Sequence, residues 1–76
     1  MAKAYVLVTT ENNVEQDVKR LIEKIQGVKS VELVLDVYDI VVTLECEDMH
    51  SLKETVNGSI GLTKGVRSTA TMVVAE

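Results

Sequence analysis

Residues 31–47 read VELVLDVYDIVVTLECE, and this stretch decides the fold. Apolar and polar residues alternate on both sides of its centre, which is typical of two half-buried strands. We expect one strand over residues 31–36 and the next over residues 38–47. Because so few residues separate them, the two strands must pair as an antiparallel hairpin. The centre holds Asp36 and Asp39 but neither glycine nor proline, so these carboxylates serve either the turn or a ligand.

The segment before the hairpin predicts a strand and a helix. Residues 4–10 (AYVLVTT) are short and rich in β-formers, which indicates the first strand. Asn12 or Asn13 is expected to cap the helix that follows, and Asn13 with Gln16 resembles a capping box. Gly27 is expected to end this helix. The apolar residues that recur at helical spacing are Val14, Val18, Leu21, Ile22 and Ile25.

The segment after the hairpin predicts a second helix and a fourth strand. Asp48 is expected to cap the helix, and we interpret Asn57-Gly58 as fraying at its end. Gly61 and Gly65 flank a loop, and residues 66–75 (VRSTATMVVA) predict the last strand. The apolar stripe of the helix is Met49, Leu52, Val56 and Ile60.

The resulting order, βαββαβ, predicts a single domain over residues 1–76. Its class is α+β and ferredoxin-like, with a four-stranded antiparallel sheet and two helices on one face. Alternation assigns the strand residues to the two faces of that sheet. The face expected to pack under the helices contains Val6, Val8, Leu33, Ile40, Val42, Leu44, Met72 and Val74. The other face contains Tyr5, Leu7, Val34, Val41, Thr43, Thr69, Thr71 and Val73.

The second face is apolar and rich in threonine, whereas a solvated sheet face is normally mainly charged. Leaving several such side chains in water would forgo several kcal/mol at about 25 cal/mol per Å². We therefore expect two subunits to dimerise through this face, although a merely apolar surface is the alternative. Self-association would also support the small core of a 76-residue chain.

Composition excludes several classes of function. Cys46 is the single cysteine, and with His50 it lacks the paired spacing of a metal site, so we expect no disulfide, metal or cofactor. The net charge of −4, with scattered Lys and Arg, is against direct nucleic-acid binding. No apolar run approaches about 18 residues, so we expect no membrane span and a cytoplasmic location.

The remaining chemistry-bearing residues have structural interpretations. His50 is expected to be exposed early in the second helix, and Cys46 is expected to be a small core residue. No nucleophile or buried base accompanies Asp36 and Asp39, so we predict no catalytic residue.

Four segments resemble the Lrp/AsnC ligand-binding domain, also called the RAM domain. They are, in order, GVKSVE, the YD that opens the third strand, EDMHSL and GVRSTATMVV. The resemblance extends from Ala4 to Val74 and implies an effector-binding and oligomerisation module linked to transcription regulation. In this family, dimers form sheet to sheet and assemble into rings of four or five dimers, giving octamers or decamers.

Family members usually carry this module after a helix-turn-helix domain, whereas this chain begins directly at the first strand. The resemblance therefore implies a stand-alone module that does not touch DNA itself. It would join full-length relatives or sequester an amino acid.

The family's effector, usually an amino acid, binds between neighbouring dimers, where the loop between strands two and three lines the pocket. The family pattern in that loop is Thr/Ser-Gly-x-Tyr/Phe-Asp. This sequence keeps Tyr38 and Asp39 but has Leu35 and Asp36 in the first two positions. Carried over by position, Asp39 would bond the effector's ammonium group. Leu33, Met49, Met72 and Val73 match positions associated with effector response, although packing is the other interpretation of both methionines.

Asp36 is the main departure from the family pattern. Glycine lets a turn adopt positive φ, and aspartate tolerates that conformation better than most residues. The added carboxylate would repel the carboxylate of an amino acid or attract a cationic side chain. Effector binding would then be altered, weakened or lost.

Two other functions stay open. One is a purely architectural ring subunit. The other is a small oxygenase, because dimeric ferredoxin-like barrels include such enzymes, although the chain has no Trp or Phe and one His.

Overall fold

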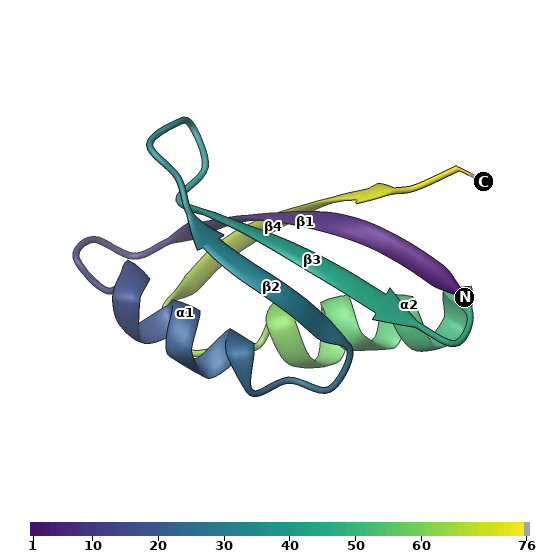
Figure 1. Cartoon of the computed structure of the whole chain (residues 1–76). Helices are drawn as coiled ribbons and strands as arrows, with labels where there is room; N and C mark the ends of the chain where they lie inside the picture. Colours follow the sequence, from purple (N-terminus) through teal and green to yellow (C-terminus); the bar gives the residue numbers. More distant parts are fainter. Residues whose placement is uncertain (76) are drawn as a thin grey trace.

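The computed structural model describes residues 1–75, which form one sheet flanked by helices (Figure 1). A π-helical turn, η1, directly continues the second helix. In chain order the elements are β1 (Ala2–Thr10), α1 (Glu15–Glu23), β2 (Val28–Leu33), β3 (Ile40–Cys46), α2 (Met49–Thr55), η1 (Val56–Ile60) and β4 (Val66–Val73).

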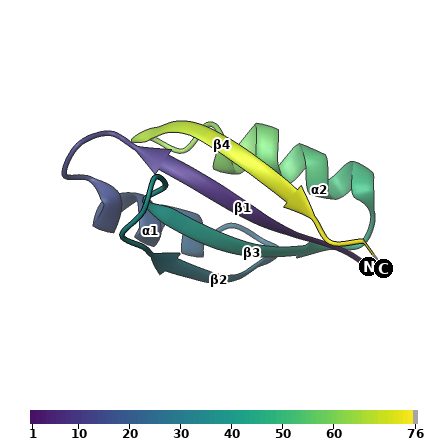
Figure 2. The same cartoon turned by 90° about the horizontal axis from the view of Figure 1, so that it is seen from above.

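The sheet is antiparallel, and its strands lie in the order β2-β3-β1-β4. Both helices lie below the sheet in Figure 1. Figure 2 shows the four strands from above, the side of the sheet away from the helices. The ferredoxin-like prediction is confirmed: the order is βαββαβ, and both helices cover the same face.

Branched aliphatic side chains form the core between the sheet and the helices. Val6 and Val8 of β1 are fully buried, and their partners across β3 are Val42 and Ile40. Burying one such side chain contributes about 1.5–3 kcal/mol, so these contacts hold the layers together. The helical residues buried in the same cluster are Val18, Ile22, Leu52, Val56 and Ile60.

The connection between β2 and β3 is longer than the predicted hairpin turn. β2 runs from Val28 to Leu33 and β3 begins at Ile40, so residues 34–39 form a six-residue loop. The Val34 amide donates to the Asp39 carbonyl oxygen at 2.9 Å and closes this loop. The prediction was wrong because apolar alternation continues through the loop, where it no longer reports a strand.

The face assignment along β4 was inverted. Thr69 and Thr71 lie opposite Val8 and Val6 of β1, which places them on the helix side, and Val73 lies on that side opposite Ala4. Met72 lies opposite Tyr5, on the side away from the helices. Val74 lies beyond the end of β4. Thr69, Thr71 and Val73 on one side of this edge strand are not clearly more polar than Ala70 and Met72 on the other. Alternation therefore could not assign the two sides of β4 to the faces of the sheet.

The start of α1 also differs from the predicted capping box. Asn13 adopts a φ of +67°, the left-handed region, whereas a capping residue normally has extended φ and ψ. Val14 takes the cap position, and no side chain caps the helix. The helix ends at Glu23, and Gly27, with a φ of +98°, forms the turn into β2 instead of ending the helix.

The start of α2 agrees with the prediction, but its end does not. The Ser51 amide donates to Asp48 Oδ1 at 2.8 Å, so Asp48 is the N-cap. Asn57 and Gly58 do not fray but lie inside η1. The Gly61 amide donates to the Val56 carbonyl oxygen at 2.7 Å, the i to i−5 bond of a π-helical turn.

Gly65, in the loop before β4, packs closely against α1. Its φ is +96°, and a Cβ there would lie 2.7 Å from Cγ2 of Val18, which is fully buried. We expect Gly65→Ala to lower the free energy of unfolding by roughly 2–4 kcal/mol, from left-handed strain and overpacking. Urea denaturation measures this.

Gly58→Ala is the matched control, because no heavy atom lies within 4 Å of a Cβ built there. It should leave stability unchanged or raise it by up to about 1 kcal/mol. Equal losses in both variants would contradict the packing argument.

Candidate functional site

The sheet face away from the helices, here named the open face, has an apolar centre. Tyr5 and Leu7 of β1 lie opposite Thr43 and Val41 of β3, and all four are half-buried. Ser30 and Glu32 of β2 and Ala70 and Met72 of β4 also lie on this face by register. Lys3 Nζ lies 5.5 Å from the centre of the Tyr5 ring, at one end of the face.

The predicted interface residues therefore divide into three groups. Tyr5, Leu7, Val41 and Thr43 lie on the open face as expected. Thr69 and Thr71 lie on the helix side, for the register reason given above. Val34 lies outside the strands, in the β2–β3 loop.

Asp39 fixes the base of the β2–β3 loop to the end of β1. Its Oδ2 accepts hydrogen bonds from the Thr10 amide at 2.8 Å and from Thr10 Oγ1 at 3.3 Å. Its own amide donates to the Val8 carbonyl oxygen at 2.9 Å. Thr10 is the one buried polar residue of the described core, and this carboxylate satisfies it. Asp39 therefore has a structural role in the subunit.

Asp36 lies in a different environment, on the exposed tip of the same loop. Its Oδ1 accepts a hydrogen bond from the Val37 amide at 2.8 Å. Among residues 1–75, positive φ angles occur at Asn13, Gly27 and Gly65, so the loop turns at Asp36 without a left-handed residue. The replacement of the family's glycine therefore needs no strained backbone.

The other predicted effector residues lie in two places. Leu33 and Tyr38 adjoin the loop, but Leu33 is 37% exposed because β2 is an edge strand, so it is not the core residue we expected. Met49 and Val73 come together at the opposite end of the sheet, in a hollow of about 360 Å³. Met72 is 52% exposed on the open face, and not packed under the helices. The residues that line the hollow are Met1, Ala2, Lys3, Glu45, Met49, Val73 and Val74.

The predicted effector residues thus lie in two separate groups, which would be two half-sites if these residues bind an effector. Asp39 is bonded to Thr10 at one end of β1, whereas Val73 lies opposite Ala4 near the other end. Ala4 and Thr10 lie six positions apart along β1, a span of about 20 Å. One amino acid cannot contact both half-sites of the same subunit.

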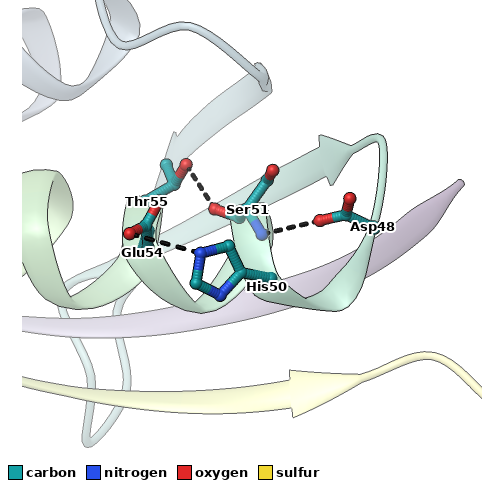
Figure 3. Close-up of polar contacts among 5 residues, drawn as sticks. All are labelled: Asp48, His50, Ser51, Glu54 and Thr55. Carbon is teal, nitrogen blue, oxygen red and sulfur yellow. Dashed lines mark hydrogen bonds and ion pairs between the residues drawn. The ribbon is translucent and has the colours of Figure 1, made fainter.

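Polar contacts link residues along helix α2 (Figure 3). His50 Nε2 lies 3.4 Å from Glu54 Oε2, and both side chains are exposed, as predicted for His50. Thr55 Oγ1 donates to the Ser51 carbonyl oxygen at 2.9 Å. Cys46 is half-buried and packs against the core, as expected for a small apolar residue.

Among residues 1–75, no three His, Cys, Asp or Glu side chains are grouped so as to hold a metal ion. No helix in this range has the length and apolar character needed to cross a membrane.

Comparison with known proteins identifies the family. The model of the Lrp/AsnC ligand binding domain matches residues 3–76, so the chain belongs to that family, as the resemblance implied. This is a regulatory family. No curated protein sequence matches the chain.

Solved structures give the same fold. TTHA0845 from Thermus thermophilus is 28% identical, with a TM-score of 0.94, and the match covers 100% of this chain and 95% of that one. FFRP-DM1 is 24% identical, with a TM-score of 0.94 over 99% of this chain and 100% of that one. A Neisseria meningitidis transcriptional regulator, NMB0573, solved with L-Met, is 17% identical, with a TM-score of 0.87. That match covers 99% of this chain but 50% of the regulator.

The bond between Asp39 and Thr10 should contribute measurably to stability. Asp39→Ala leaves the buried Thr10 amide without its acceptor, so we expect the free energy of unfolding to fall by about 1–3 kcal/mol. The matched control is Asp36→Ala at the exposed tip, with an expected change within about 0.5 kcal/mol. Chemical denaturation measures the free energy of unfolding of both variants. If Asp39→Ala loses no more than Asp36→Ala, the structural role of Asp39 is refuted.

Asp48 should make the stability of α2 depend on pH. The hydrogen bond from the Ser51 amide lowers the pKa of Asp48 below its ordinary value of 3.8. Because the folded-state pKa is lower than the unfolded one, the stabilisation is present above the unfolded pKa and is lost as pH falls through the folded pKa. Thermal unfolding should show Asp48→Ala less stable than wild type at pH 7, with the gap closing below pH 3.8.

Asp48→Asn is the control, because asparagine caps a helix without titrating. Its difference from Asp48→Ala should persist at low pH. A gap between wild type and Asp48→Ala that is independent of pH would refute the assignment.

Proposed function

We propose that this chain is an effector-binding and oligomerisation module that takes part in transcription regulation by binding an amino acid or a similar small molecule. Its family is defined by ligand binding, and a regulator of the same fold was solved with L-Met. The observation that carries the proposal is the division of the predicted effector residues into two half-sites at opposite ends of one sheet.

A site completed by two subunits accounts for this division. The loop half-site of one subunit, with Tyr38 and Asp39, would face the hollow half-site of another, with Met49 and Val73. The hollow of about 360 Å³ suits a small ligand, since ligand sites typically measure about 300–1,000 Å³. Met49, Val73 and Val74 line part of it, and these residues would suit an amino acid with an apolar side chain. The homo-oligomer would be a ring of dimers, because a repeated contact between unlike ends gives a ring when the rotation between neighbours closes on itself.

The dimer within that ring would form through the open face. Its apolar centre consists of Tyr5, Leu7, Val41 and Thr43. From β4, this interface would include Met72 and not the predicted Thr69 and Thr71. Apolar residues at the centre of a patch are typical of a stable homodimer interface.

Direct DNA contact by this domain is not part of the proposal. The net charge is −4, whereas binding to phosphates requires clustered Lys and Arg. The module would act through full-length Lrp/AsnC regulators, or by sequestering the effector.

A purely architectural subunit is the second candidate, and one observation favours it. The Asp39 carboxylate expected to receive the effector's ammonium group already accepts hydrogen bonds from Thr10. Asp36 also adds a negative charge at the loop tip, which opposes an amino acid's carboxylate.

A thermal-shift screen of the twenty amino acids separates the two candidates. A working site should be stabilised by one or a few apolar amino acids, by about 2.7 kcal/mol at 100 times the dissociation constant. Val73→Glu, which places a charge in the hollow, should abolish the shift. Leu62→Glu, exposed outside the hollow, should preserve it. A flat response to all twenty would favour the architectural subunit.

A further inference from the structure

The β2–β3 loop, residues 34–39 and here named the arm, exposes two large apolar side chains. Leu35 is fully exposed and Val37 is 81% exposed, which makes them two of the most exposed large apolar side chains in the described chain. Their neighbour Asp36 bonds back to the Val37 amide, so the polar group between them is already satisfied. Two such exposed apolar side chains on one loop are available to pack against a partner.

The arm stands on the same side of the sheet as the open face. Figure 1 shows the loop rising above the strands, whereas α1 and α2 lie below them. Figure 2, seen from above, shows it next to the end of β1, close to where β3 begins. A second subunit laid on the open face would therefore meet the arm at its side.

The arm is also held in place before any partner arrives. Asp39 binds the Thr10 amide and hydroxyl, and the Val34 amide closes the loop on the Asp39 carbonyl oxygen. The Asp39 amide donates to the Val8 carbonyl oxygen of β1, one of the two inner strands of the sheet. A pre-ordered loop loses little conformational entropy on association, which favours its use as a contact.

The sheet alone offers a modest area to a partner. Four strands of about seven residues cover on the order of 400 Å² in plan, from the strand spacing and the rise per residue. A stable interface buries about 800 Å² on each partner. Leu35 and Val37 lie outside the sheet, so they add apolar area to the surface that a partner on the open face can cover.

We infer that the arm is a dimerisation arm: Leu35 and Val37 of each subunit pack against the second copy that covers the open face. This inference rests on the sheet-to-sheet dimer of the proposed function and adds a second element to its interface. Twofold symmetry requires both arms to make the same contact, so the pair of subunits is held at the sheets and at two arms. Leu35 then belongs to the interface in addition to adjoining the loop half-site.

Sedimentation equilibrium of the full chain tests the arm. Leu35→Ser/Val37→Ser should raise the dimer dissociation constant about tenfold or more, because two buried apolar contacts per subunit are lost. Both side chains are exposed in the subunit, so circular dichroism should show an unchanged fold. Leu62→Ser is the matched control: Leu62 is 76% exposed in the segment before β4, and its replacement should leave the constant unchanged.

Leu7→Lys, a charge at the centre of the open face, distinguishes this inference from the proposed function. If Leu7→Lys dissociates the dimer while the arm variant matches wild type, the arm is refuted and the sheet-to-sheet dimer stands. If wild type is a monomer at micromolar concentration, both are refuted. If the arm variant and Leu7→Lys both weaken the dimer and Leu62→Ser does not, both are supported.

Discussion

The register in which β1 pairs with β3 and β4 determines the rest of this structure. It places Val6 and Val8 on the helix side with Val42 and Ile40, and that cluster holds α1 and α2 against the sheet. The same register leaves Tyr5 and Leu7 on the side away from the helices, where both side chains are half-buried. A shift of one residue would exchange the two faces, so the core and the open face are two results of one constraint.

The two aspartates of the β2–β3 loop have different physical roles, although they lie three residues apart. Asp39 satisfies the buried end of β1 through Thr10, so its carboxylate belongs to the fold of the subunit. Asp36 is exposed and bonds only the next amide, which leaves its charge at the tip of the arm. A carboxylate in a loop thus acquires its role from the donors that tertiary structure brings to it, and not from its residue type.

Part of the candidate site could be placed from the sequence, because alternation of apolar and polar residues along a strand shows which side chains share a face. The open-face positions Tyr5, Leu7, Val41 and Thr43 followed from alternation along β1 and β3. Thr10 was missed as the partner of Asp39, because the two are 29 residues apart and nothing in the spacing connects them. The half-sites were also not evident, since a family pattern lists Asp39 and Val73 together without saying that they lie at opposite ends of the sheet.

The sequence by itself determined the order of elements, the ferredoxin-like class and the capping of α2 by Asp48, because local periodicity and capping depend on residues a few positions apart. Only the tertiary structure decided that Thr69 and Thr71 face the helices and that residues 34–39 leave the sheet as a loop. Strand register depends on pairing with β1, and the loop's path depends on where Val8 and Thr10 lie. These are contacts between distant segments, which no local pattern records.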